Sequence, residues 1–159
     1  MFREMRRFKQ QLPEEQCIQI LKEAPRGVLA LLGDDDYPYT IPLDHFYEDG
    51  KLYFHCAKEG HKLEAIENSD KCSYCVLANC TPDGDTSDGQ FYYFDSVVVF
   101  GRISRVEDEE VIIRQVRKLA HKYYTDLDAV ERDIKQNGPR TALLELTIEH
   151  MTGKHVHEK

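Results

Sequence analysis

Apolar and polar residues alternate in several short stretches of this chain, and acidic or glycine-containing turns separate these stretches. Residues 27–32, 37–46 and 51–57 are rich in β-branched, leucine and aromatic residues, and the turns between them are GDDD and EDG. Such runs predict strands, and short turns favour pairing between strands that follow one another. We therefore predict a three-strand meander over residues 27–57.

Three further stretches continue the strand pattern. Residues 71–78, 91–106 and 141–151 carry the same residue types, and Gly101 interrupts the longest run. A glycine within a strand is typical of a bend or bulge. The loop of residues 79–90 contains DGDTSDG, which lacks the spacing of a calcium loop and is predicted to be a flexible acidic turn. The last residues, TGKHVHEK, are predicted to form a polar, mobile tail.

Helical spacing of apolar residues appears in four other segments. Residues 12–25, 59–70, 107–124 and 126–136 each place apolar side chains one turn apart, and acidic residues lead the third of these segments while basic residues end it. The resulting order is helix, three strands, helix, two strands, two helices and a strand. This order predicts a mainly β fold, a partly open β-barrel with appended helices, in a single domain spanning residues 1–159.

Composition narrows the classes of function. The chain has 159 residues, 41% of them hydrophobic, and a formal net charge of −8. An acidic chain without a Lys and Arg stripe disfavours nucleic-acid binding, and the absence of a long apolar run disfavours a membrane-spanning protein. The first residues lack a secretory signal, and five irregularly spaced cysteines do not indicate a disulfide framework. We therefore expect a cytoplasmic protein.

Two prolines stand in the predicted second strand, at positions 38 and 42. Proline has no amide hydrogen for a strand ladder, so this strand must lie at an edge, contain a bulge, or leave its neighbours. Its unpaired backbone groups could then meet a ligand.

The stretch FHCAKEGHK contains two histidines and two lysines, at the point where a predicted strand ends and a predicted helix begins. The predicted helix opens at Gly60, followed by His61 and Lys62. Helix starts present unpaired amides and partial positive charge, so these residues favour an anion such as phosphate. The alternative is that Lys58, His61 and Lys62 form an ordinary solvated helix face.

Histidines and cysteines elsewhere offer weaker candidates. His55 follows Tyr53 by two strand positions, so both side chains should point to one face, toward the barrel interior or a groove. Cys72 and Cys75 should face opposite sides of a strand, which disfavours a zinc site built with Cys80. The candidate ligands His150, His155 and His157 lie in or near the predicted tail, where they are expected to be solvated.

Several common catalytic motifs are missing from the sequence: GxGxxG, GxxxxGK[ST], GxSxG and HExxH do not occur. By contrast, the strand YPYTIPL, the hairpin DGKLYFH with AxxGHK behind it, and the strand FxSVVVFGR follow one another at a consistent spacing, and a GK pair occurs at residue 153. In these motifs, over most of residues 5–106, the chain resembles the pyridoxamine 5′-phosphate oxidase-like flavoproteins, and within them the nitroimidazole-resistance (Nim) branch.

This resemblance implies a split β-barrel homodimer with FMN at the subunit interface. Lys62 and His61 would hold the flavin 5′-phosphate, and residues 40–43 would lie along the isoalloxazine ring. His55 matches a strand-end histidine of the branch and becomes the candidate catalytic residue, because imidazole exchanges protons readily near neutral pH. The cofactor-binding residues implied are Thr40, Ile41, Pro42, Leu43, His55, Ala57, His61 and Lys62.

The implied activity is an FMN-dependent oxidoreductase that uses NAD(P)H to reduce a small electron-poor acceptor, with a nitroaromatic as one candidate. Pyridoxamine phosphate oxidases proper carry an arginine-containing motif near the C-terminus, whereas GKHVHEK contains no arginine, which disfavours oxidation of vitamin B6. Two alternatives stay open: a non-catalytic flavin- or haem-binding module with His55 or His61 as an axial ligand, and a structural zinc protein using Cys72, Cys75 and Cys80.

Overall fold

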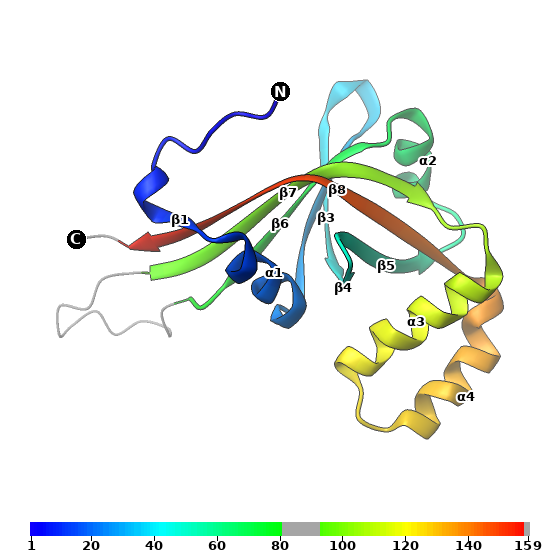
Figure 1. Cartoon of the computed structure of the whole chain (residues 1–159). Helices are drawn as coiled ribbons and strands as arrows, with labels where there is room; N and C mark the ends of the chain where they lie inside the picture. Colours follow the sequence, from blue (N-terminus) through cyan, green and yellow to red (C-terminus); the bar gives the residue numbers. More distant parts are fainter. Residues whose placement is uncertain (81–92, 158–159) are drawn as a thin grey trace, which may run out of the picture.

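The computed structural model describes residues 1–80 and 93–157, within which eight strands form one antiparallel sheet (Figure 1). Seven strands follow the order β3-β2-β6-β7-β8-β5-β4, and β1 pairs with β8. The predicted acidic turn DGDTSDG lies outside the described residues. The strands are β1 (Gln11–Leu12), β2 (Arg26–Leu32), β3 (Pro38–Asp44), β4 (Phe46–Glu48), β5 (Lys51–Ala57), β6 (Lys71–Ala78), β7 (Tyr93–Arg105) and β8 (Thr141–His157).

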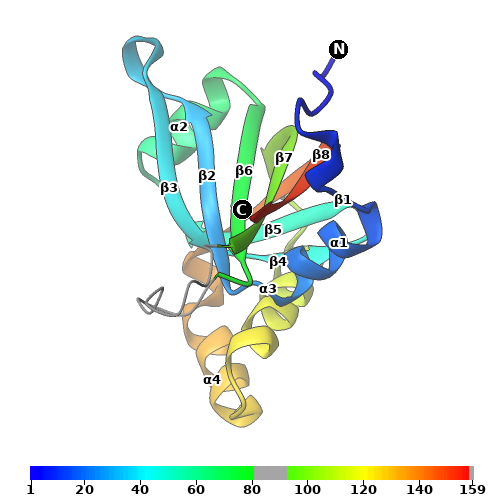
Figure 2. The ribbon, with the colours of Figure 1, turned by 90° about the vertical axis from the view of Figure 1, so that its left-hand side faces the viewer.

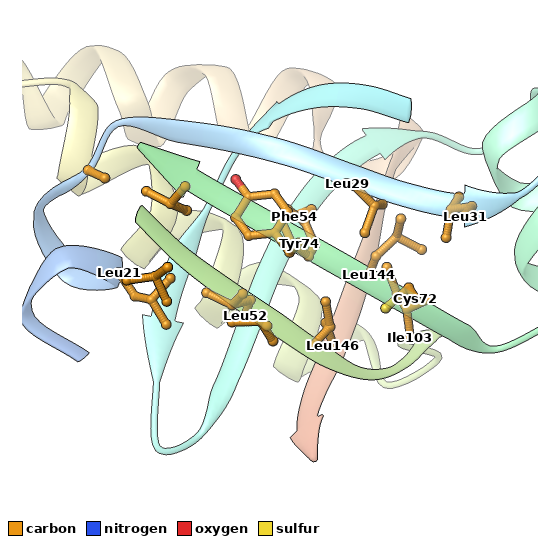
Figure 3. Packing of buried hydrophobic residues seen from close by; sticks show 14 of the residues in the cluster. Leu21, Leu29, Leu31, Leu52, Phe54, Cys72, Tyr74, Ile103, Leu144 and Leu146 are labelled. Carbon is orange, nitrogen blue, oxygen red and sulfur yellow. The ribbon is translucent and has the colours of Figure 1, made fainter. Parts of the chain in front are cut away.

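The sheet curls, so that β4 and β5 run across the direction of β2, β3 and β6 (Figure 2). Alternation along each strand sends one set of side chains inward. Figure 3 shows this inner cluster, in which Tyr74 of β6 and Phe54 of β5 pack edge to face with ring centroids 5.1 Å apart. Burying each large apolar side chain contributes about 1.5–3 kcal/mol. The predicted mainly β fold with a barrel-like closure is confirmed.

In the described residues, four α-helices flank the sheet: α1 (Glu14–Glu23), α2 (His61–Asn68), α3 (Glu109–Tyr123) and α4 (Leu127–Asn137). Short 3-10 turns occupy Phe8–Gln10, Asp34–Asp36 and Gly138–Arg140. The carboxylates of Asp108 and Asp126 cap α3 and α4 by accepting backbone amide hydrogens. Helices α3 and α4 lie side by side as a hairpin beyond one end of the sheet (Figures 1 and 2).

Helix α3 is tied to the sheet by polar contacts with Glu48 of β4. Lys118 Nζ lies 2.5 Å from Glu48 Oε1, and Gln115 Nε2 donates to Glu48 Oε2 at 2.8 Å. The hydrogen bond from Lys118 lowers the pKa of the Glu48 carboxyl. The middle of α3 is therefore fixed relative to β4.

Gly101 marks the bend predicted in the long strand β7. The register between β7 and β8 shifts between Phe100 and Gly101. A Cβ atom at Gly101 would lie 2.1 Å from the carbonyl oxygen of Thr147, so no other residue fits without moving the neighbouring strand. Glycine is required here by close approach of the two backbones.

The predicted three-strand meander is wrong in its pairing. β2 pairs with β3, but β5 pairs with β4 and β8 instead of with β3. The predicted strand over residues 37–46 breaks at His45, whose ring turns into the core, and the chain then starts β4. A local hydrophobic pattern does not encode this change of partner.

The predicted polar tail is also wrong. Strand β8 continues to His157 and pairs with β7 along this length. His155 Nδ1 lies 2.6 Å from Asp95 Oδ1, and Asn79 Nδ2 donates to Asp95 Oδ2 at 2.7 Å. A polar sequence can be a strand when its partner strand supplies the backbone hydrogen bonds.

Candidate functional site

His55 lies near the end of β5 with an exposed side chain, on the face opposite the core residues Leu52 and Phe54. Tyr53 shares the face of His55, as predicted, but is almost entirely buried. Burial and the Glu145 carboxylate raise the pKa of Tyr53 to about 12. On the outer face of β5, the side chain of Tyr53 is therefore buried and that of His55 is exposed to solvent.

His55 borders two hollows in the surface. One, of about 330 Å³, is lined by His55 together with Arg26, Pro42, Leu43 and Asp44. At its rim, Arg26 Nε donates to Asp44 Oδ1 at 2.9 Å. The other hollow, of about 590 Å³, lies between His55 and the α3–α4 hairpin. His55 thus stands where β3 and the helical hairpin both come close to β5.

Strand β3 carries the residues expected along a flavin ring. It lies at one end of the strand order, so its two prolines occupy an edge strand, which is one of the three arrangements that the sequence left open. Thr40 and Pro42 are exposed, whereas Ile41 and Leu43 pack partly against the core. One face of this edge is therefore open to a ligand while the other holds the strand in place.

The start of α2 has the geometry expected of an anion site. Gly60 has φ +123°, a conformation that favours glycine, and a Cβ there would meet open space. No side chain caps this helix start, and Lys62 follows in the first turn. Burial raises the pKa of the nearby Cys56 thiol, although the positive charges of Lys62 and Arg105 act in the opposite direction.

His61 is held against β3. Its ring stacks on Tyr39 with centroids 4.1 Å apart, and its Nε2 lies 3.5 Å from Asp34 Oδ2. The structure therefore brings the start of α2 beside β3, and separately brings His55 beside Pro42 and Leu43. Ala57, exposed at the end of β5, pairs with Thr141 of β8.

A buried polar cluster around His45 was missed by the sequence patterns. His45 Nε2 lies 2.7 Å from the Leu21 carbonyl oxygen, and its Nδ1 lies 2.9 Å from the Tyr74 hydroxyl. The same hydroxyl lies 2.8 Å from the Leu43 carbonyl oxygen. Burial, and then the charge of Lys122, lower the pKa of His45 to about 4. A neutral ring at this position joins α1, β3 and β6.

The end of α3 completes that cluster. Lys122 Nζ donates to the carbonyl oxygens of Ala24 and His45 at 2.6 and 3.0 Å, and the Tyr123 hydroxyl donates to Pro25. Burial lowers the pKa of Lys122 to about 8. The available signal was an apolar stripe ending in Lys-Tyr-Tyr, which predicts a helix but not the partners of its last turn.

The cysteines do not converge. Cys72 is buried in the core, and Cys75 lies on the opposite face of β6, as predicted. Among residues 1–80 and 93–157, no group of three or more His, Cys, Asp or Glu side chains is arranged to hold a metal ion. His150 is stacked on Phe2, with ring centroids 4.6 Å apart.

Helices across the described part of the chain are too short or too polar to span a membrane.

A known protein family matches most of this chain. The sequence profile of a family described as pyridoxamine 5′-phosphate oxidase matches residues 13–155. No curated protein matches this chain. The solved structures below are less than 25% identical to this chain, so their similarity concerns the fold.

Three of these structures are similar over most of the chain. A flavocytochrome from Azotobacter vinelandii has a TM-score of 0.79 at 19% identity, covering 98% of this chain and 75% of its own. A proposed 5-nitroimidazole antibiotic resistance protein from Bacteroides thetaiotaomicron has a TM-score of 0.76 at 18% identity, covering 92% and 87%. An FAD- and haem-binding protein from Mycobacterium smegmatis has a TM-score of 0.75 at 16% identity, covering 94% and 74%. The predicted split β-barrel fold is confirmed.

Proposed function

This chain belongs to the pyridoxamine 5′-phosphate oxidase family, and from that premise we propose that it binds FMN and uses it to pass two electrons from NAD(P)H to a small electron-poor acceptor. The observation that carries this proposal is the meeting of His55 with Pro42 and Leu43 around one hollow. The start of α2 also lies against β3, where the His61 ring stacks on Tyr39.

The phosphate of FMN fits the start of α2. Gly60 leaves open space there and has no side chain to cap the helix, and Lys62 supplies a positive charge. The chain as a whole carries a net charge of −8, so a dianion needs local attraction of this kind. His61 would act mainly by positioning, since its ring is already held by Tyr39 and Asp34.

The electron acceptor that we propose is a small nitroaromatic compound. When bound, the flavin relays two electrons between donor and acceptor. Reduction of a nitro group to a nitroso group breaks one N–O bond, consumes two electrons and two protons, and releases water. NAD(P)H supplies both electrons and one proton. His55 donates the second proton from its imidazole to the acceptor oxygen and regains it from solvent.

The flavin site requires a second copy of the chain in this proposal. The outer face of the sheet carries the exposed apolar residues Val28 on β2, Leu77 on β6 and Phe100 on β7. Pro42 pairs with Val28, so this face continues into the expected flavin strand. Covering it with a partner would bury apolar surface and enclose the flavin ring.

The dimer is tested by Leu77→Lys, which should yield monomers in light scattering and weaken flavin binding. Leu127 on α4 is also an exposed leucine, and Leu127→Lys should leave both properties unchanged. A monomeric parent protein that holds flavin tightly would contradict this part of the proposal.

The cofactor is tested by visible absorption of the purified protein and by titration of apoprotein with FMN. Lys62→Glu should weaken FMN binding at least tenfold, because it replaces an attraction to the phosphate by a repulsion. Lys135→Glu on α4 makes the same charge change away from β3 and should have no effect. Protein that neither carries nor takes up FMN would exclude the proposed function.

Haem binding is a second candidate, favoured by the similarity to the flavocytochrome and to the FAD- and haem-binding protein. His55 is the more accessible axial ligand, since His61 is stacked on Tyr39. Haem added to the apoprotein should then give a Soret band that shifts in His55→Ala. An unchanged spectrum in that variant would exclude His55 as the ligand.

A further inference from the structure

The groove between His55 and the α3–α4 hairpin is larger than the hollow beside β3, at about 590 Å³. Val116 and Ala120 of α3 and Val130 and Ile134 of α4 give it apolar walls. None of Gly60, His61 and Lys62, which form the proposed phosphate site, lines this groove. It is large enough for a small aromatic molecule.

The charged residues lining this groove are acidic. Asp126 and Asp133 line it, and among its described lining residues there is no Lys or Arg. Both carboxylates are held in place: Asp126 Oδ1 accepts from the Ala129 amide at 2.9 Å, and Asp133 Oδ1 accepts from Asn137 Nδ2 at 2.6 Å. Tyr124, which is 64% exposed, also lines the groove. Carboxylates and an exposed aromatic ring both attract cations.

His55 connects this groove to the expected flavin strand, because it also lines the hollow formed by Pro42 and Leu43. We infer that the α3–α4 groove binds the electron acceptor, and that the acceptor is a small aromatic molecule carrying a positive charge. This inference rests on the proposed function for the reaction, but the charge selectivity of the groove stands on its own geometry. The ring would lie between the apolar helix walls, with its cationic group near Asp126 and Asp133.

The same charges argue against other occupants. A nicotinamide dinucleotide carries phosphates and haem carries propionates, and both would be repelled by two fixed carboxylates. The electron donor therefore reaches the flavin from another direction.

The inference is tested on the FMN-loaded protein with three probes that share one ring: 4-nitrobenzylamine, which is a cation, 4-nitrotoluene, which is neutral, and 4-nitrobenzoate, which is an anion. We expect kcat/KM to fall in that order. Asp133→Asn should lower kcat/KM for the cation about twofold to fivefold and leave the neutral probe unchanged, since one exposed charge is removed. Asp128→Asn removes a charge from α4 outside the groove and should leave the order intact.

Binding of 4-nitrobenzylamine, measured by calorimetry with and without FMN, separates this inference from the proposed reaction. Binding that weakens in Asp133→Asn supports the groove even in a protein that shows no reductase activity. Active protein that prefers the anion, or treats all three probes alike, overturns the inference and leaves the proposed function standing. Absence of calorimetric binding, or haem uptake dependent on His55, also overturns it.

Discussion

His45 precedes β4 and His55 lies near the end of β5, so both stand at the open end of the β4–β5 hairpin, yet one is buried and the other is exposed. His45 is completely buried, with both ring nitrogens at hydrogen-bonding distance from Leu21 and Tyr74. His55 is exposed and borders two hollows. The ring whose nitrogens are both engaged serves the fold, whereas the open ring is available to a ligand. Neighbouring histidines in one sequence can thus have separate roles that only burial distinguishes.

His45→Ala should produce the largest change. It leaves a cavity, removes the partner of the Leu21 carbonyl and removes one of the two partners of the Tyr74 hydroxyl, so the free energy of unfolding should fall by about 2–4 kcal/mol. Urea denaturation followed by circular dichroism measures this loss. His55→Ala in the same experiment should change the free energy of unfolding by less than about 0.5 kcal/mol. Equal losses would remove the distinction between the two histidines.

His55→Ala should instead lower the rate of acceptor reduction about 100-fold or more, the usual contribution of a positioned proton donor. Flavin absorption should be retained. His121→Ala, on the exposed surface of α3, should keep the parent rate. Steady-state oxidation of NADH with a nitroaromatic acceptor gives the measurement, and full activity in His55→Ala would refute the proposed catalytic role.

Lowering the pH should reveal the structural role of the buried His45 without a mutation. Burial lowers the pKa of His45 from 6.5 to about 4, so the unfolded chain binds a proton in this range and the folded chain does not. The stability that depends on a neutral His45 is complete above pH 6.5 and is lost as pH falls toward 4, with about 2 kcal/mol gone by about pH 5. Denaturation at several pH values should show a steeper loss in the parent than in His45→Gln.

Tyr74→Phe should give the smallest effect. It keeps the ring that packs on Phe54 but removes the hydroxyl beside His45 and Leu43, at a cost of about 1 kcal/mol. Thermal denaturation detects this change, and activity should be retained. A loss as large as that of His45→Ala would mean that the hydroxyl, not the imidazole, holds the cluster together.

The local elements were largely predictable. Glu109–Tyr123 forms a helix within the predicted residues 107–124, and the strand prolines lie at an edge, one of the arrangements that their missing amides allow. Gly101 was expected at a bend and lies at a register shift. These features depend on residue spacing and on the backbone chemistry of proline and glycine, which are legible in the sequence.

Strand partners and the surroundings of each histidine were not predictable from local pattern. β5 pairs with β8, which is far away in the chain, so the expected meander was wrong. His155 was expected in a mobile tail, but the continuation of β8 brings it to Asp95. The expected flavin-binding residues came from resemblance to a family, and their roles stay predictions that Lys62→Glu and His55→Ala can test.

The sequence by itself determined where the chain is extended, helical or bent, and which segments carry cations, since these properties depend on residues close together in the chain. Tertiary structure alone decided that His45 is enclosed while His55 opens toward β3 and the α3–α4 hairpin. The physical reason is that burial and electrostatic environment depend on which distant segments pack around a side chain. The curl of the sheet sets those neighbours, and no short stretch of sequence records them.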